Sequence, residues 1–270
     1  GPKPRSVHLC SMDTLSHRPM AGQSTRLVLA TDLDGTFLGG SPQHRRMLYD
    51  WLREQPDVQL IFVTGRDPDF IGSLCADGTV PSPEFVIGDV GTTIARFESG
   101  RVQPMIDLEM PITQAWHGLA TEVQARLLSV GGLRLQNVPF RHRLSYEYDT
   151  SFDRAALTVL EDLAVDTIVS HGCFVDVLPR GVSKGPSLLR LIAHLGLEAE
   201  RVLVAGDTLN DLSMFETGLH GALVGGSEAE LLNATAHLPR AHRCRHIGAG
   251  GIIEAIHAHT LHATPPELPL

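Results

Sequence analysis

Short apolar runs with the composition of buried strands alternate along this chain with segments of helical periodicity. Strands are predicted at 26–31, 58–63 and 201–205, and helices at 42–54 and 187–195. Strands that alternate with helices usually pair in parallel through crossover connections. The order therefore predicts an α/β fold with a Rossmann-like parallel sheet, for which 270 residues are ample.

The middle of the chain departs from this alternation. Apolar side chains at helical spacing cover 113–130, and a second helix is predicted at 153–164. Strands are predicted at 133–135, 144–148 and 167–177. A run of strand, strand, helix and strand indicates a separate α+β unit.

We therefore expect an inserted cap domain. The cap is predicted at 108–177, and the core consists of 25–107 and 178–262. Residues 1–24 are predicted to form a mobile leader, and 263–270 a flexible, proline-containing tail.

Composition excludes several classes of function. The formal net charge of -9 disfavours binding to nucleic acid, which needs a basic face. No apolar run approaches the roughly 18 residues that cross a bilayer, and 1–24 lack the apolar stretch of a signal peptide. The four cysteines (Cys10, Cys75, Cys173 and Cys244) are scattered, without a CxxC pair. A cytoplasmic protein, monomeric and without a membrane partner, is expected.

Four short polar motifs stand directly after a predicted strand or just before a predicted helix, where open α/β sheets bind ligands. They are Asp32-Leu33-Asp34-Gly35-Thr36, Thr64-Gly65-Arg66, Lys184, and Gly206-Asp207-Thr208-Leu209-Asn210-Asp211. Each one alone is ordinary turn or N-cap chemistry. Their occurrence together, in this order, favours a shared site.

The carboxylates of these motifs predict a metal site. If the strands lie side by side, Asp32, Asp34, Asp207 and Asp211 meet at one edge of the sheet. Two such charges about 4 Å apart repel by roughly 4 kcal/mol at an effective dielectric near 20. A divalent cation or shared protons must reduce this repulsion, and oxygen ligands favour Mg²⁺. Lys184, before a helix N-terminus, suggests that an anion is also bound there.

This set of motifs resembles the haloacid dehalogenase (HAD) superfamily, whose fold is a Rossmann-like core with an inserted cap. The resemblance implies that Asp32 is a nucleophile that forms an aspartyl-phosphate and that Asp34 is the general acid and base. Thr64 and Lys184 would hold the transferring phosphoryl group. Mg²⁺ would lie between Asp32, the Asp34 carbonyl and Asp207, supported by Asp211 directly or through water.

Longer segments resemble the sucrose-phosphate phosphatase branch of that superfamily. They are 175–185, 205–217, 89–94 and 144–146, and the similarity runs over roughly 26–258. The resemblance implies a small sugar phosphate as substrate. The branch often carries a Lys-Asp pair where this chain has Cys173 and Phe174. The sugar therefore stays open among sucrose 6-phosphate, a related disaccharide phosphate such as mannosylfructose phosphate, and an amino-sugar phosphate such as kanosamine 6-phosphate.

Further substrate-binding residues are predicted around the motifs and in the cap. They are Gly65, Arg66, Asn210, Asp176, Arg143 and Tyr146, besides Thr64 and Lys184. Along the segment Arg143, Ser145, Tyr146, Glu147, strand alternation directs only every second side chain inward. Trp116 is predicted to belong to the core of the cap rather than to a sugar platform.

The C-terminal region is rich in histidine, at positions 237, 242, 246, 257, 259 and 262. A spacing such as His257-x-His259 suits a metal, but residues i and i+2 of a helix point to different faces. No metal site is predicted there.

Two other functions share the same core motifs. One is a phosphomutase, which returns the phosphoryl group to a hexose phosphate. The other is a catalytically silent sugar-phosphate-binding module related to sucrose-phosphate synthase. Such modules typically lose a catalytic residue. All six residues that the resemblance assigns to the reaction are present here, namely Asp32, Asp34, Thr64, Lys184, Asp207 and Asp211.

Overall fold

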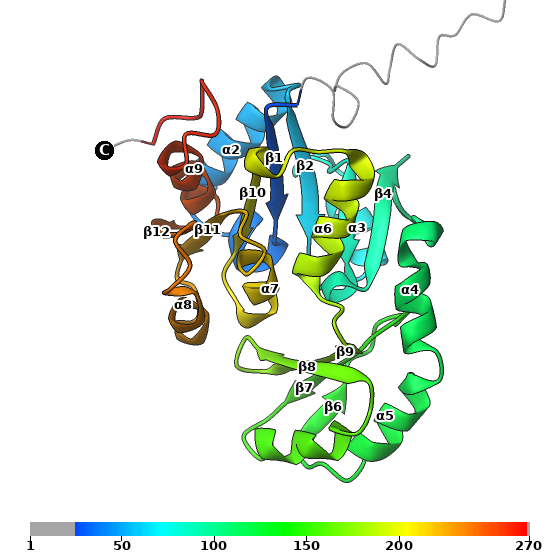
Figure 1. Cartoon of the computed structure of the whole chain (residues 1–270). Helices are drawn as coiled ribbons and strands as arrows, with labels where there is room; N and C mark the ends of the chain where they lie inside the picture. Colours follow the sequence, from blue (N-terminus) through cyan, green and yellow to red (C-terminus); the bar gives the residue numbers. More distant parts are fainter. Residues whose placement is uncertain (1–24, 269–270) are drawn as a thin grey trace, which may run out of the picture.

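The computed structural model describes residues 25–268, which fold around two β-sheets. The predicted leader, 1–24, and the last two residues of the predicted tail lie outside the described residues. Figure 1 shows the larger sheet with helices on both faces, and the smaller sheet beyond one end of its strands. This arrangement confirms the predicted α/β fold.

The larger sheet has eight strands in the order β12-β11-β10-β1-β2-β3-β4-β5. Pairing is parallel from β12 to β3 and antiparallel for β4 and β5. The strands are β1 (Leu27–Thr31), β2 (Val58–Val63), β3 (Phe85–Gly88), β4 (Thr93–Glu98), β5 (Arg101–Pro104), β10 (Val202–Gly206), β11 (His220–Gly225) and β12 (Ala241–Ile247).

Helices bury both faces of this sheet, which is why its central strands are continuously apolar. Leu27 and Leu29 of β1 face one layer, made of α2 (Pro42–Glu54), α3 (Pro68–Cys75) and α9 (Ala249–Ala258). Val28 and Ala30 face the other, made of α6 (Lys184–Leu195), α7 (Leu212–Phe215) and α8 (Ala229–Thr235). Single turns complete the core: η1 (Leu33–Phe37), η2 (Asp89–Gly91), η4 (Ala199–Arg201) and η5 (Leu209–Asp211).

The smaller sheet has the strand order β6-β7-β9-β8 and is antiparallel. Its strands are β6 (Leu133–Leu135), β7 (Leu144–Tyr148), β8 (Val165–Ser170) and β9 (Phe174–Pro179). Three helical segments pack on it: α4 (Ile106–Trp116), α5 (Leu119–Leu127) and the 3₁₀ segment η3 (Arg154–Leu160). Trp116 is buried in their shared core, as predicted.

Three predicted elements of this unit were wrong in detail. The helix predicted at 113–130 is two helices, because Gly118 adopts a positive φ of 78° between α4 and α5. The helix predicted at 153–164 is a 3₁₀ segment, Arg154–Leu160. The strand predicted at 167–177 is the hairpin of β8 and β9, which turns through the positive φ values of His171 and Gly172.

The predicted boundaries of the cap at 108 and 177 stay a prediction. Helix α4 packs Ile112 into the core of the larger sheet and Trp116 into that of the smaller one, so it contributes to both. The predicted flexible tail contacts the core over its described part: Trp51 donates to the carbonyl of Thr264, and Leu268 packs on the α2 layer. No helix of residues 25–268 has the length and apolar character to cross a membrane.

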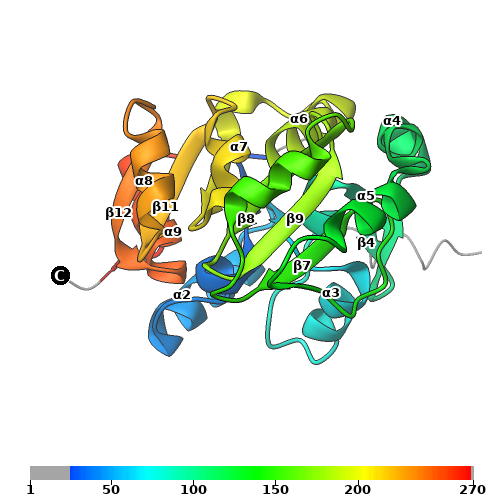
Figure 2. The same ribbon diagram turned by 90° about the horizontal axis from the view of Figure 1, so that it is seen from below.

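The two sheets enclose the ends of the parallel strands. In Figure 1 the carboxyl ends of β1, β2 and β10 point toward the smaller sheet, and Figure 2 shows this sheet from the side that lies away from the core. The predicted motifs follow β1, β2 and β10 and therefore lie between the two units.

Candidate functional site

Lys184 joins three of the four motifs. Its Nζ donates to Asp32 Oδ1 (3.1 Å), Asn210 Oδ1 (3.0 Å) and Asp211 Oδ1 (2.7 Å). The side chain is fully buried at the first residue of α6, three residues earlier than the helix start predicted from the sequence. Burial opposes its charge, but Asp211 and Asp32 outweigh burial and raise the pKa of Lys184. An ammonium group is therefore fixed beside the Asp32 carboxylate.

Asp32 and Asp207 are the two carboxylates of the site with oxygens not fully committed to protein donors. Each follows a strand, β1 and β10, which pair directly in the sheet. Burial, Asp211 and Asp207 raise the pKa of Asp32 well above its usual range, against the influence of Lys184. Burial and Asp211 raise the pKa of Asp207 to about 6. The single positive charge of Lys184 therefore does not neutralise the carboxylates of this site.

The sharp turn after Asp32 brings the chain close to Asp207. Gly35 has a φ of 75°, and a Cβ atom at this position would lie 2.2 Å from Asp207 Oδ2. The next residue, Thr36, donates from Oγ1 to Asp207 Oδ1 (3.1 Å). The glycine of this motif is therefore needed both for its backbone conformation and for the space that the carboxylate occupies.

Asp211 acts behind these two carboxylates. Its Oδ2 accepts from the backbone amides of Asp207 (2.9 Å) and Thr208 (3.1 Å), while Oδ1 accepts from Lys184. The side chain is fully buried. Asp211 therefore orients Asp207 and Lys184 and has little capacity left for a direct metal bond.

Asp34 is held at the wall of the site by Arg66. The guanidinium donates from Nε to Oδ2 (2.7 Å) and from Nη2 to Oδ1 (3.1 Å), and it stacks 4.2 Å above the ring of Phe70. Both side chains are nearly half exposed. Sequence analysis predicted each residue but not the pairing, which gives the carboxyl group a fixed direction.

The loop that follows β2 is tied to the turn of η2. Thr64 is fully buried, and its Oγ1 accepts from the amide of Arg66 (3.0 Å). Its carbonyl accepts from the amide of Val90 (3.0 Å), and the carbonyl of Arg66 accepts from the amide of Asp89 (2.9 Å). Asp89 and Val90 both have positive φ, 51° and 61°. Backbone strain of this kind persists where surrounding contacts enforce it.

Arg143 connects this turn to the smaller sheet. Its guanidinium donates to Asp89 Oδ1 (3.0 and 3.2 Å) and to the carbonyl of Gly65 (3.1 Å), and it contacts Ser145 Oγ. Ser145 in turn donates to Asp176 Oδ1 (2.5 Å). The ion pair of Arg143 and Asp89 is almost completely buried. The sequence indicated Arg143 and Asp176, but nothing in it marked Asp89 as their partner.

A cavity of about 260 Å³ opens where the two units meet. Seven predicted site residues line it: Asp32, Asp34, Gly65, Arg66, Arg143, Asp176 and Asn210. Gln136 and His171 were not identified from the sequence, whereas Val90 lies in the segment 89–94 that resembles the sucrose-phosphate phosphatase branch, and Phe174 marks a departure from the pattern of that branch. None of these four residues was predicted to line the site, because they come from turns and strand ends. Thr64, Lys184, Asp207 and Asp211 lie behind this lining.

Tyr146 was wrongly predicted as a sugar contact. On β7 it alternates with Arg143 and Ser145, so it points to the opposite face of the sheet. There it is buried in the apolar core beneath α5. Burial raises the pKa of its hydroxyl group.

The donors of this site fit Mg²⁺. Asp32 and Asp207 offer carboxylate oxygens, and one oxygen each of Asp32, Asp207 and the supporting Asp211 lie within 4.8 Å of one another. They are hard ligands, with neither cysteine nor histidine among them, and the raised pKa values of Asp32 and Asp207 reflect excess negative charge.

Comparison with known proteins agrees with this geometry. Residues 25–260 match the family described as sucrose-6F-phosphate phosphohydrolase. Glucosylglycerol-phosphate synthase of Pseudomonas anguilliseptica is 40% identical over 231 residues, which are 85% of this chain but only 30% of that protein. This chain thus spans less than a third of that relative. Mannosylfructose-phosphate phosphatase of Agrobacterium fabrum is 29% identical over 244 residues, covering 85% of this chain and 95% of that protein.

A solved structure shows the same fold. The sucrose-phosphatase of a Synechocystis species, determined with sucrose and phosphate, superposes with a TM-score of 0.79 at 26% identity, over 87% of this chain and 98% of that one. Since the family match includes nearly every described residue, this chain belongs to the sucrose-6F-phosphate phosphohydrolase family.

Proposed function

We propose that this chain is a Mg²⁺-dependent phosphatase that hydrolyses the phosphomonoester of a small sugar, with Asp32 as the nucleophile. The observation that carries this proposal is the contact of Lys184 with Asp32, Asn210 and Asp211 beside Asp207. These residues belong to three distant segments of the chain, and their contact lies beside the cavity of about 260 Å³ between the two units.

Asp32, the carbonyl of Asp34, and Asp207 would hold the ion. When bound, Mg²⁺ supplies positive charge to the phosphoryl oxygens during transfer. Asp211, whose oxygens already accept from Lys184 and two backbone amides, would support the site by orienting Asp207.

The protein groups would then act in two steps. Asp32 attacks phosphorus, the bond to the sugar oxygen breaks, and Asp34 gives its proton to that oxygen. Asp34 next takes a proton from water, which attacks the aspartyl-phosphate and releases phosphate and the free carboxylate. Arg66 fixes the direction of the ionised Asp34 carboxylate, which acts as the base in the second step.

Lys184 and Asn210 would stabilise the transferring group. The ammonium of Lys184 is charged and excluded from water, so its attraction for the phosphoryl oxygens is strong. The side-chain oxygen Oδ1 of Asn210 accepts from Lys184 and from Thr208 Oγ1 (2.8 Å), which leaves the side-chain NH₂ group to donate toward the cavity. Thr64 would contribute a hydroxyl from the loop after β2.

The sugar would lie against residues of the smaller sheet. Gln136, His171, Phe174 and Asp176 line that side of the cavity. The relatives act on or make different glycosyl phosphates, as their names state, so the informative panel contains sucrose 6-phosphate, mannosylfructose phosphate and glucosylglycerol phosphate.

The test is phosphate release from this panel with and without Mg²⁺, for the wild type and Asp32→Asn. Loss of the nucleophile should lower turnover at least about 10³-fold. The exposed Asp50→Asn serves as the control and should retain full activity. Turnover that survives Asp32→Asn would contradict the mechanism.

The same assay separates the two alternatives. A phosphomutase would interconvert hexose phosphates in the presence of a hexose bisphosphate without net release of phosphate. A silent module, as in a chain fused to a synthase, would bind sugar phosphates but release no phosphate from any of them or from p-nitrophenyl phosphate.

A further inference from the structure

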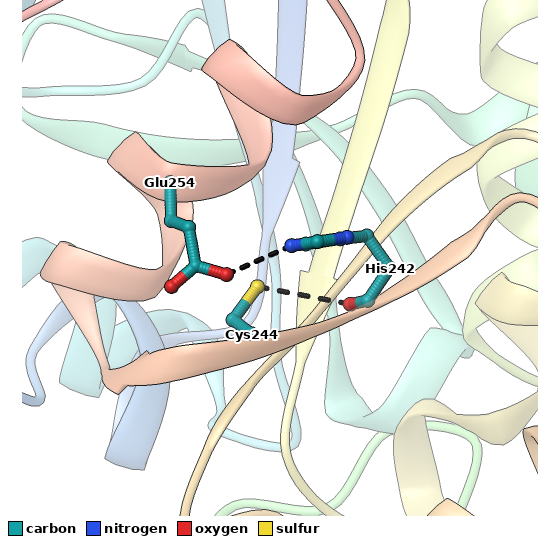
Figure 3. A group of neighbouring side chains, drawn as sticks. All are labelled: His242, Cys244 and Glu254. Atoms are coloured by element: carbon teal, nitrogen blue, oxygen red, sulfur yellow. Dashed lines mark hydrogen bonds and ion pairs between the residues drawn. The ribbon is translucent and has the colours of Figure 1, made fainter.

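A second group of potential ligands lies at the edge of the larger sheet, away from the phosphoryl site. His242 and Cys244 on β12 and Glu254 on α9 each offer a ligand atom, and these atoms lie within 4.8 Å of one another. Figure 3 shows the imidazole of His242 directed at the Glu254 carboxylate, with the Cys244 sulfur beside them. The shortest contact joins His242 Nε2 and Glu254 Oε2 at 2.8 Å.

Strand alternation produces this grouping. Residues 242, 244 and 246 of β12 lie on one face of the strand, the face that α9 covers. His246 Nδ1 contacts the other oxygen of Glu254 at 2.7 Å. Sequence analysis assigned no metal site to this region because it considered helical spacing, whereas His242 and His246 belong to a strand.

The sulfur of Cys244 is buried between β12 and α9, where it contacts the carbonyl oxygens of Gly251 (3.3 Å) and His242 (3.7 Å). The Glu254 carboxylate beside it accepts hydrogen bonds from His242, His246 and two backbone amides of β12. A cation bound between them would replace the weak contacts of the thiol with a metal–thiolate bond.

We propose that His242, Cys244 and Glu254 bind a Zn²⁺ ion. Imidazole, thiolate and carboxylate together are typical ligands of zinc, whereas Mg²⁺ prefers oxygen alone. On binding, the thiol proton of Cys244 leaves to solvent, and His242 binds through Nε2 as a neutral imidazole with its proton on Nδ1. His246, hydrogen-bonded to the second oxygen of Glu254, orients that ligand.

The proposed zinc site is open to solvent, and an ion bound there would link β12 to α9. The side chains of His242 and Glu254 are 33% and 18% exposed, whereas Cys244 is buried beneath them. Because β12 is the last strand of the sheet, an ion shared with Glu254 would fasten this edge strand to α9. An ion that binds only the folded chain stabilises it.

The first experiment uses Co²⁺ as a spectroscopic substitute for Zn²⁺ in chelator-treated protein. A cobalt–thiolate bond gives a near-ultraviolet charge-transfer band, which carboxylates such as Asp32 and Asp207 cannot produce. We expect the band in the wild type and in Cys75→Ser, a control that removes another buried thiol. We expect none in Cys244→Ser. A missing wild-type band, or a band that persists in Cys244→Ser, would overturn the proposal.

A second experiment measures Zn²⁺ affinity by competition with a chelating dye. His242→Gln should weaken binding at least about tenfold, while His257→Gln, on the same part of the chain but outside the group, should not. With excess Mg²⁺ present to occupy the site of Asp32 and Asp207, Zn²⁺ should also raise the thermal unfolding midpoint of the wild type but not of His242→Gln. Equal affinity in both variants would refute the site even if Cys244→Ser failed to fold.

Discussion

At the scale of single residues, the proposed site of phosphoryl transfer depends on the absence of a side chain at Gly35, which leaves room for Asp207. Gly35→Ala would place a Cβ atom 2.2 Å from Asp207 Oδ2 and force this carboxylate to move. Displacement of a catalytic group by about 1 Å can cost on the order of 100-fold in rate. We therefore expect Gly35→Ala to lower phosphate release by about that factor.

Gly78→Ala is a matched control for this variant. Gly78 has the same φ of 75°, but nothing lies within 4 Å of its added Cβ. Both substitutions carry a similar backbone cost of about 1–2 kcal/mol, which urea unfolding measures. Equal activity in the two variants would mean that the contact with Asp207 is unimportant.

The titration of Asp207 leads to a pH-dependent prediction for metal-free protein. Burial and Asp211 raise its pKa from 3.8 to about 6, so the folded state binds this proton more tightly than the unfolded state. The resulting stability is present below about pH 4 and is lost as the pH rises through 6. The loss is roughly 1.4 kcal/mol for each unit of pKa shift.

Urea unfolding in chelator between pH 4 and 7 measures this effect. The free energy of unfolding should fall more steeply across this range in the wild type than in Asp207→Asn, which lacks the titrating group. Mg²⁺ should counteract the fall in the wild type, because the ion replaces the proton. Parallel pH profiles for the two proteins would contradict the prediction.

The site residues that could be identified from the sequence belong to motifs that directly follow a strand or precede a helix. Asp32, Lys184 and Asn210 could be predicted because a buried strand or a helix start fixes the position of its neighbouring residues. His171 could not, since it lies in a turn of positive φ that carries no recognisable spacing. Asp89 belongs to a segment with a family resemblance, but its ion pair with Arg143 could not be predicted from the sequence. Contacts between the two units are set by tertiary packing alone.

At the scale of elements, the predicted boundaries were accurate where local signals coincide. Helix α2 begins and ends at the predicted residues: Ser41 caps it through a hydrogen bond to the amide of His44, and Pro42 occupies its first turn. Strand β2 is buried at every residue, and five of its six residues are apolar, with Gln59 the exception. The segment 113–130 has one apolar stripe but two helices, because Gly118 interrupts the backbone without interrupting the pattern.

Two ion pairs join the unit of the smaller sheet to the core, and they differ in how deeply they are buried. Arg143 of the smaller sheet pairs with Asp89 in a fully buried site, whereas Arg154 of η3 pairs with Glu230 of α8 in solvent. Removing one partner of a buried pair typically costs about 3–5 kcal/mol, and an exposed pair contributes about 0–1 kcal/mol. We expect Arg143→Ala to destabilise the protein by the larger amount and Arg154→Ala by the smaller.

Urea unfolding of the two variants, together with limited proteolysis, tests this difference. Arg143→Ala should also increase cleavage in the segments that join the two units, since its guanidinium holds the turn of η2 against the smaller sheet. Similar losses of stability in the two variants would mean that burial of the pair does not matter.

At the scale of the whole molecule, the two units are held together more firmly on one side of the cavity than on the other. Helix α4 packs into both cores, and Arg143 is buried in its ion pair with Asp89. On the opposite side lie the exposed pair of Arg154 with Glu230 and the contact of β8 with η5. We therefore infer that α4 and Arg143 form the pivot and that the hairpin of β8 and β9 moves to admit substrate.

Hydrogen exchange can locate this motion. Mg²⁺ with orthovanadate, which occupies phosphoryl sites, should favour the closed arrangement and slow exchange in the hairpin turn at 171–173, where His171 reaches the cavity. Exchange in α5, on the far face of the smaller sheet, should stay unchanged and serves as the internal control. If the turn exchanges equally with and without the analogue while Asp32→Asn still binds sugar phosphate, the hairpin is fixed and substrate enters by another route.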